Sequence, residues 1–304
     1  MRYFIILLCS LFCTVVQAKD IPVLTRFDES SAAYQALSFY VRELNATQNE
    51  YNFMIKVFPG ALGENADLRS IALGKEGEEH ILHSTLTSYT SNPIQFKNSW
   101  DREKSFIILK SFWVTVNVLT VNPEEKDIKS FVEKLKKKDV IYLGGLTTGG
   151  SRDTLSSVFL KYYNLENKTK LIRYTLGSDM NRAVLNNEID FAINVPNAEG
   201  ATKVILTSGK HANRKYPYAP SGKEIGMDDF FNETMSIFSV PSTLPLFAEK
   251  MKPVLEKMCS NPKLDEFAEK LASTMTCYDS NYIRKQIAEE NEWVKKYLLI
   301  LDPK

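Results

Sequence analysis

The sequence predicts an α/β protein that is built as two lobes. From Ile21 onward, short apolar runs alternate with amphipathic runs, which is the pattern of βα units and of a largely parallel sheet. The 304 residues are enough for two lobes with separate hydrophobic cores. Residues 113–121 form a strand-like run long enough to cross between lobes, and residues 234–240 are the candidate for the return crossing. Two such connections act as a hinge beside a cleft.

The N-terminal segment has the features of a secretory signal peptide. A basic residue, Arg2, precedes an apolar run, and the small-residue pattern that ends at Ala18 predicts cleavage after this residue. The run is shorter than the ~20 residues that span a bilayer. Cys9 and Cys13 lack the preceding small-residue box that lipid attachment needs, so a lipoprotein is the weaker alternative. We therefore expect an exported protein.

The charge balance argues against nucleic acid as a partner. The chain has 38 basic and 37 acidic residues, and cleavage after Ala18 removes Arg2 and no acid, so the two numbers become equal. A protein that binds polyanions needs a surplus of Lys and Arg on one face. The densest basic run, residues 134–138, lies at the end of an amphipathic segment, where a helix dipole favours cations.

Helices are predicted where apolar residues recur at helical spacing, and strands where short runs are rich in β-branched and aromatic residues. The first lobe is predicted to contain a strand from residue 21, a helix over 34–44, a strand over 53–57, a short helix over 68–74 and strands over 80–83, 106–109 and 113–121. The second lobe is predicted to contain a helix over 128–135, a strand over 140–143, a helix over 155–162, a strand over 171–174, a helix over 180–185 and strands over 189–193 and 203–206.

Everything after the return strand, which is closed by Pro241, is predicted to be helical. The expected helices cover residues 246–258, 264–271 and 281–298. The predicted organisation is a signal peptide over 1–18, a first part of lobe 1 over 19–117, lobe 2 over 118–237, and a return to lobe 1 with C-terminal helices over 238–304.

The cysteines and histidines give no reason to expect a metal or another cofactor. Only Cys259 and Cys277 follow the cleavage site, and they form a plausible disulfide in an oxidising compartment, with two buried free thiols as the alternative. His80 and His83 fall in a strand-like run, where positions i and i+3 point to opposite faces, and His211 is distant in sequence.

Six short segments together carry a family resemblance over nearly the whole mature chain. In order they are FPGALG at 58–63, SNP at 91–93, LGGLTTGGS at 143–151, NEID at 187–190, SVPSTLP at 239–245 and EENEW at 289–293. Their order and spacing resemble the motifs of the periplasmic solute-binding proteins of the tripartite tricarboxylate transporter family, also called the Bug or TctC-like family. Each segment alone is a common turn or helix, so the order carries the resemblance.

The resemblance implies a two-lobed periplasmic-binding-protein fold of type II-like form, with two hinge strands and a C-terminal helical segment. It also implies a monomeric periplasmic receptor that captures a small organic anion, such as a di- or tricarboxylate, an amino acid or an aromatic acid. Such a receptor delivers its ligand to membrane permease subunits and catalyses no reaction. A module of the same fold that feeds a different permease or a sensor kinase is the alternative.

The first ligand loop of the family usually reads P-x-G-G-x-x-D, and this sequence departs from it. Ser30 and Ser31 stand where the family has glycines. Asp28 and Glu29 would repel an anion unless they point to solvent or the ligand also carries a cationic group. We still expect Phe27, Ser30 and Ser31 to contribute to the ligand site.

The second loop supplies hydrogen-bond donors for an anion. A Gly-rich loop that follows a strand and opens a helix lets backbone N–H groups approach a carboxylate, although an ordinary tight turn is the alternative. Ser84 and Thr85 are candidates by their position after a strand, and Asp190 either contacts the ligand or braces its lobe. The second-loop candidates are Thr147, Thr148, Gly149, Gly150 and Ser151.

Arginines and alternative chemistries complete the predictions. Arg152 and Arg173 could each pair with a second carboxylate of the ligand, although a lone arginine is more often on the surface. A hydrolase with Ser151 as its nucleophile lacks the G-x-S-x-G elbow and a histidine motif for a base. Nucleotide binding is disfavoured because Gly150 replaces the lysine of a phosphate-binding loop.

Overall fold

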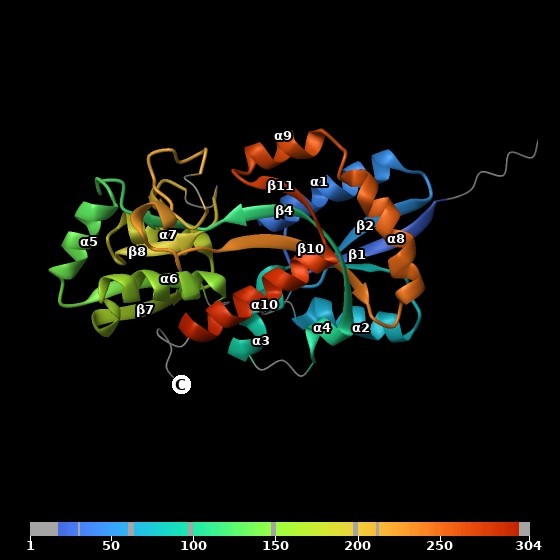
Figure 1. The fold of residues 1–304 in the computed structure, drawn as a ribbon, viewed down its shortest axis with the longest axis horizontal. Coiled ribbons are helices and arrows are strands. Elements are labelled where there is room, and N and C mark those ends of the chain that lie inside the picture. Colours follow the sequence, from blue (N-terminus) through green and yellow to red (C-terminus); the bar gives the residue numbers. More distant parts are fainter. Residues whose placement is uncertain are drawn as a thin grey trace, which may run out of the picture.

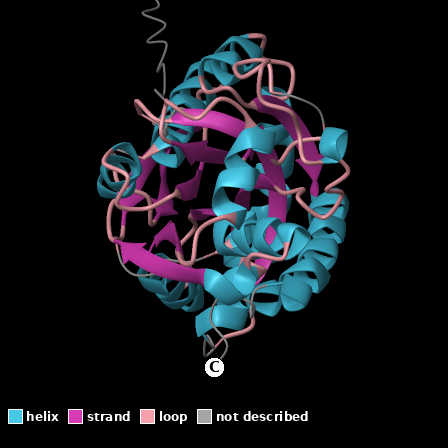
Figure 2. Cartoon of the chain, turned by 90° about the vertical axis from the view of Figure 1, so that its left-hand side faces the viewer, coloured by secondary structure: helices cyan, strands magenta, loops and turns pink. Residues whose placement is uncertain are grey.

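The computed structural model contains two halves, each built on one β-sheet, with two long strands running between them (Figure 1). Viewed from one end, helices lie around the outside of the strands (Figure 2). Within the described part of the chain, no helix combines the length and apolar character needed to cross a membrane. The structure describes residues 18–29, 31–59, 64–96, 100–146, 150–196, 200–210 and 213–297. The predicted signal peptide, except for Ala18, lies outside these residues.

The first sheet has six strands in the order β11-β4-β10-β3-β1-β2. Its strands are β1 (Lys19–Thr25), β2 (Tyr51–Val57), β3 (Ile81–Thr85), β4 (Phe106–Val116), β10 (Glu233–Pro241) and β11 (Thr274–Asp279). β1 pairs in parallel with β2 and β3, whereas β10 runs antiparallel to both β3 and β4, and β11 runs antiparallel to β4. The prediction of a largely parallel sheet is therefore wrong, because the long strands that connect the halves run in opposite directions.

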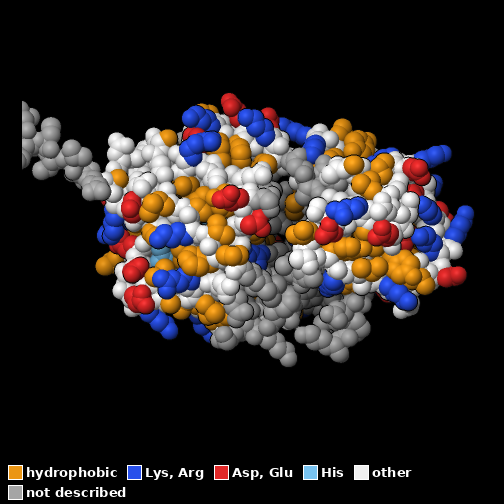
Figure 3. Space-filling view, turned by 180° about the vertical axis from the view of Figure 1, so that it is seen from behind, with side chains coloured by type: hydrophobic (Ala, Val, Ile, Leu, Met, Phe, Trp, Pro, Cys, Tyr) orange, Lys and Arg blue, Asp and Glu red, His pale blue; other side chains and the backbone are white. Residues whose placement is uncertain are grey.

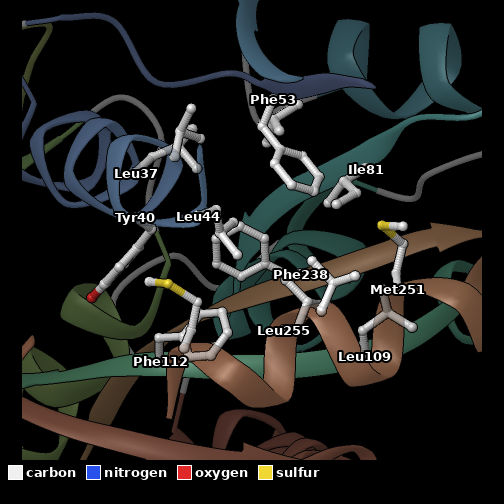
Figure 4. Close-up of a cluster of buried hydrophobic side chains, with 14 of the residues drawn as sticks. Leu37, Tyr40, Leu44, Phe53, Ile81, Leu109, Phe112, Phe238, Met251 and Leu255 are labelled. Carbon is white, nitrogen blue, oxygen red and sulfur yellow. The ribbon is translucent and has the colours of Figure 1, made fainter. Parts of the chain in front are cut away.

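Helices cover both faces of this sheet because consecutive strand residues point to opposite sides. Val23 packs into the cluster formed with α1 (Ala32–Thr47) and α8 (Pro245–Met258), while Leu24 packs on the other face against α2 (Glu64–Lys75). Figure 4 shows side chains of α1 and α8 meeting those of the strands in the larger cluster. The short helices α3 (Ser91–Phe96) and α4 (Arg102–Ser105) precede β4.

The second sheet has five strands in the order β7-β6-β8-β5-β9. They are β5 (Val118–Val121), β6 (Ile141–Leu146), β7 (Thr169–Tyr174), β8 (Phe191–Asn194) and β9 (Lys203–Thr207). β6 is parallel to β7 and β8, and β5 is antiparallel to β8 and β9, so this sheet is also mixed.

Three helices complete the core of the second half. α5 (Ile128–Lys136) and α6 (Ser151–Tyr163) pack on one face of the sheet, and α7 (Gly177–Leu185) packs on the other. The α5 N-terminus begins where the sequence supplies a cap, because the Asp127 carboxylate accepts a hydrogen bond from the backbone N–H of Ser130.

The two crossings between the halves are tied together by a buried polar network of Asn117, Ser208 and Asn232. Asn117 separates β4 from β5, and Asn232 directly precedes β10. The Asn117 side-chain amide donates to the Asn232 side-chain oxygen at 2.8 Å. The Ser208 hydroxyl donates to the Asn232 carbonyl at 2.6 Å and accepts from the Asn117 backbone N–H at 2.8 Å. We call these three residues the crossing network.

The C-terminal part is not wholly helical, which corrects one prediction. α9 (Lys263–Lys270) and α10 (Ser280–Tyr297) are separated by β11, an edge strand that pairs with β4. α10 reaches both halves (Figure 1), because Ile283 and Ile287 pack in the first half while Trp293 and Tyr297 pack against the core of the second.

Candidate functional site

The candidate site lies where the parallel strands of the two sheets end and face each other. β1, β3 and β6 are each paired in parallel with a neighbour, and ligands of open α/β sheets bind beyond the carboxyl ends of such strands. Figure 3 shows the surface hollowed between the two halves of the molecule. The loops that follow these strands contain most of the residues predicted from the sequence.

The loop after β1 is ordered by its own side chains. The Phe27 backbone N–H donates to the Thr25 hydroxyl at 3.3 Å, and the Phe27 ring meets the His83 ring edge-on at 5.7 Å. The Ser31 hydroxyl donates to the carbonyl of Asp28 and accepts from the backbone N–H of Tyr34, so it caps α1. The hydroxyl of Ser31 is therefore engaged within its own loop.

The acidic side chains of this loop do not fill the site. Asp28 and Glu29 are both exposed, which agrees with the alternative in which they point to solvent.

Asp153, in the first turn of α6, is 6% exposed at its side chain and forms an ion pair with Arg173 at 2.6 Å. That ion pair balances the acid in the first turn of α6 and gives Arg173 a partner.

The end of β3 presents two predicted hydroxyls and a buried histidine. Ser84 and Thr85 are 2% and 5% exposed, and Thr85 shares a hydrogen bond with the Thr87 hydroxyl at 2.9 Å. Burial raises the Tyr89 pKa, and the Ser84 hydroxyl is the least of the groups that offset this rise; Ser84 forms no hydrogen bond of ordinary geometry with a described residue. These side chains lie at the carboxyl end of β3, as the sequence predicts.

His83, which directly precedes Ser84 on β3, is a weak base. Burial, and then the positive charge of Arg26, lower its pKa from 6.5 to about 3. One ring nitrogen, Nδ1, is 3.2 Å from the Thr25 hydroxyl, and Nε2 has no hydrogen-bond partner among the described residues. The ring is therefore neutral and packed between Phe27 and Phe238.

The second loop ends at the N-terminus of α6. Gly150 is the N-cap and has a φ of +101°, a backbone conformation that favours glycine. Ser151 is the first helical residue and is 3% exposed. A Cβ atom added to Gly150 would lie 3.7 Å from the Ser91 hydroxyl at the start of α3. The second-half loop therefore approaches the first half at Ser91, a residue that sequence reasoning did not propose as a contact.

Several predicted residues lie outside the described residues or away from this region. Ser30, Thr147, Thr148 and Gly149 are not among the described residues. Asp190 lies at the opposite end of β6: its carboxylate accepts from the Tyr142 backbone N–H at 2.9 Å and pairs with Lys138 at 2.5 Å. This placement matches the bracing role that the sequence left open for Asp190.

The C-terminal cysteines stabilise the first half. Cys259, at the end of α8, and Cys277, in β11, form a disulfide with their Cα atoms 5.6 Å apart. Glu256 lies beside them, and the three residues are the one cluster of possible metal ligands among the described residues. Because the disulfide removes both thiolates, the cluster offers only one carboxylate.

One arginine near the site, Arg26, was missed from the sequence. Arg26 directly follows β1, and its guanidinium carbon lies 4.9 Å from the centre of the Phe27 ring. Arg152 is the second residue of α6. Both residues are partly buried, and neither guanidinium forms an ion pair or hydrogen bond within the part of the chain that the structure describes. No local sequence signal distinguishes Arg26 from a surface arginine.

Comparisons with known proteins identify the fold. No protein-family model matches the sequence, and no curated protein matches it. Among solved structures, the periplasmic binding protein BugD superposes with a TM-score of 0.73 at 15% identity, covering 91% of this chain and 97% of BugD.

Two further solved structures contain ligands. MatC from Rhodopseudomonas palustris with bound malate gives a TM-score of 0.75 at 12% identity, covering 93% of this chain and 99% of MatC. The R. palustris protein Rpa4515 with adipate gives 0.78 at 9% identity, covering 93% and 97%. These likenesses extend over nearly the whole of each chain, so this chain has the two-lobed fold of the periplasmic binding proteins.

Proposed function

We propose that the chain is an exported receptor that captures a small organic anion between its two halves and delivers it to a membrane permease of the tripartite tricarboxylate type. The observation that carries this proposal is the N-terminus of α6, which begins at the buried residues Gly150 and Ser151 and approaches Ser91 of the other half. Free N–H groups and the helix dipole at such a terminus attract an anion.

The electrostatics around this terminus support an anionic ligand. Asp153 is neutralised by Arg173, the acids of the first loop are exposed, and Arg26 and Arg152 bring positive charge. The ligands of the structural relatives, malate and adipate, are carboxylates. The proposed lining is Phe27, Ser30, Ser31, Ser84, Thr85, Thr147, Thr148, Gly149, Gly150 and Ser151.

Binding without turnover fits the chemistry of the described residues better than hydrolysis. His80 bonds to Ser70 and to the Glu78 carbonyl, His83 bonds to Thr25, and neither bonds to Ser151. A serine nucleophile needs a base within hydrogen-bond reach. Incubation with generic ester substrates checks this, and turnover that disappears in Ser151→Ala would contradict a receptor without catalysis.

The ligand class is tested by thermal unfolding in the presence of organic anions. A ligand that binds only the folded protein adds about 2.7 kcal/mol at 100 times its dissociation constant, so a mono- or dicarboxylate is expected to raise the melting temperature. Sugars and cations serve as controls. A response to a sugar or a cation, with no response to any anion, would remove the carboxylate assignment and leave the fold unaffected.

Export and delivery need separate tests. N-terminal sequencing of the protein from the periplasmic fraction should give Lys19 as the first residue. The division predicted from the sequence assigns 19–117 and 238–304 to lobe 1 and 118–237 to lobe 2, although residues 233–237 already pair in the first sheet as part of β10. Ligand uptake by cells should require both this chain and a permease with a large and a small subunit. Uptake that persists without the chain would indicate that the chain serves a different permease or a signalling protein.

A further inference from the structure

Two arginines in the candidate site differ from the other arginines of the described residues in their burial and in their lack of a partner. Arg26 and Arg152 are partly buried and lack an ion-pair or hydrogen-bond partner among the described residues. Arg102, which is 4% exposed at its side chain, pairs with Asp67, and Arg173 pairs with Asp153. Arg69 also lacks an ion-pair or hydrogen-bond partner in this part of the chain, but it is exposed to water. Only Arg26 and Arg152 combine partial burial with the absence of a partner there.

An arginine withdrawn from water without a partner is energetically unfavourable. Buried charges in proteins are normally paired or hydrogen-bonded, because the loss of hydration is otherwise uncompensated. The guanidinium group presents several donors in a planar fork that fits a carboxylate through two parallel hydrogen bonds. The two unpartnered forks therefore indicate an anion that is supplied from outside the chain.

The two arginines come from opposite halves and act on each other electrostatically. Arg26 follows the last residue of β1, and Arg152 lies in the first turn of α6. Burial, then the charge of Arg102, lower the Arg26 pKa to about 10; Asp67 opposes this, and the charge of Arg152 lowers it further. Burial also lowers the pKa of Arg152, and the charge of the neighbouring Asp153, which is itself paired with Arg173, offsets part of this change. The repulsion between two cations across the cleft is relieved when negative charge lies between them.

We propose that Arg26 and Arg152 form a clamp in which each guanidinium pairs with one carboxylate of the same ligand, so that the receptor selects dicarboxylates over monocarboxylates. This proposal rests on the proposed function, since it specifies the ligand class of the same site. Phe27 has a positioning role, because its ring lies against the Arg26 guanidinium and holds the side chain beside β3. One ligand then contacts both halves and favours the closed arrangement.

The test is a thermodynamic cycle in which one charge is removed from the protein, from the ligand or from both. The binding affinity of each combination is measured by calorimetry at low salt. Malate and adipate are used as dicarboxylates, and the monoamide of each acid removes one charge. Hydrogen bonds to charged groups are worth enough that Arg26→Gln or Arg152→Gln should weaken dicarboxylate binding about 10- to 100-fold. The monoamide should bind the wild-type protein more weakly by a similar factor, and each variant should discriminate less between acid and monoamide.

The controls separate charge pairing from a structural role. Arg69→Gln removes an exposed, unpartnered arginine and should leave binding unchanged. Arg26→Lys keeps the charge but loses the fork, so it should bind dicarboxylates with intermediate affinity. Without ligand, Arg26→Gln and Arg152→Gln should melt at or above the wild-type temperature, because an unpartnered charge has been removed. A variant that melts lower or fails to fold would show a structural partner and overturn the clamp.

The outcomes distinguish this inference from the proposed function. If wild-type protein binds dicarboxylates and both glutamine variants bind them with unchanged affinity, the clamp is wrong and the receptor function stands. If the wild-type protein prefers monocarboxylates, the clamp is likewise wrong. If the wild-type protein binds no organic anion, the proposed function itself fails.

Discussion

Glu290 in α10 provides a pH-dependent test of the packing between the two halves. Its side chain is buried, with the residue 8% exposed, and it accepts a hydrogen bond from the Thr90 hydroxyl at 2.8 Å. Burial raises the Glu290 pKa from 4.5 to about 7, and hydrogen bonds with Thr90 and Asn232 offset part of this rise. Asn232 belongs to the crossing network, so the carboxyl group lies where α10 meets the return crossing.

The sign of the effect follows from the raised pKa. The folded protein holds the proton more tightly than the unfolded chain, so this group's stabilisation is fully present below about pH 4.5 and is lost as the pH rises through about 7. A shift of this size corresponds to roughly 3 kcal/mol in the free energy of unfolding. The acids Glu233 and Glu289 line the same cavity as Glu290.

Glu290→Gln removes the titration while keeping the shape of the side chain. The variant should be more stable than wild type by roughly 3 kcal/mol at about pH 8, and the difference should shrink to about 1 kcal/mol or less at about pH 5. Urea unfolding of both proteins at the two pH values measures this. His80 and His83, whose pKa values are lowered by burial, add pH dependence of the opposite sign, but they are common to both proteins and cancel in the difference.

A difference between Glu290→Gln and wild type that does not change with pH would refute the reasoning. It would mean that the carboxyl group titrates equally in the folded and unfolded chains, and hence that it is hydrated in solution. Thr90→Val is a second check, because it removes the hydroxyl that donates to the carboxylate. It should move the midpoint of the pH-dependent change to a higher pH.

Three further substitutions test the structure. The disulfide between Cys259 and Cys277 closes a separation of 18 residues, so its removal should lower the free energy of unfolding by about 3 kcal/mol in urea unfolding. Asp67→Asn leaves the buried Arg102 charge without its partner and should cost about 3–5 kcal/mol, measured in the same way. Gly74→Ala places a Cβ atom 2.5 Å from the proline ring at the end of β10, and should cost about 1–3 kcal/mol by thermal unfolding.

Each substitution has a matched control. A reductant should destabilise the wild-type protein but not a variant that already lacks both cysteines, and equal responses would contradict a disulfide in solution. Adding Arg102→Met to Asp67→Asn should recover part of the loss, and no recovery would show that the charge is not the cause. Gly177→Ala adds a Cβ with nothing within 4 Å, so it should be neutral; a loss equal to that of Gly74→Ala would exclude a local clash.

Local patterns predicted most helices and strands but not how the strands pair. The helix over residues 34–44 was predicted because its apolar residues share one face, and α1 buries that face. The antiparallel pairing of β10 with β3 depends on the direction in which the chain returns, which periodicity does not encode. β11 was missed because it is a short edge strand between two helices, with side chains that are only partly buried or exposed.

The candidate site was predicted only where the backbone has a local signature. The Gly-rich stretch before Ser151 identified the α6 N-terminus because helix starts have characteristic residues. Asp190 was grouped with the site by alignment to a motif, yet it braces the start of β6. Arg26 was missed because its lack of a partner is a property of the folded chain. Burial and pairing of a charge depend on residues such as Asp67 and Arg102, which are distant in sequence.

The seating of α10 in both halves limits how the molecule can open. A helix is a stiff rod, and this one is held at Ile283 and Ile287 in the first half and at Tyr297 in the second. If β4 and β10 were the only connections, the halves could separate by bending these two strands. Because α10 packs in both halves, its contacts with one of them must also change when the halves separate. Its second-half end is held to Asp229 by Lys296 and Tyr297. The contacts of Lys296 and Tyr297 with the Asp229 carboxylate are therefore among those that must break or shift if the two halves are to separate.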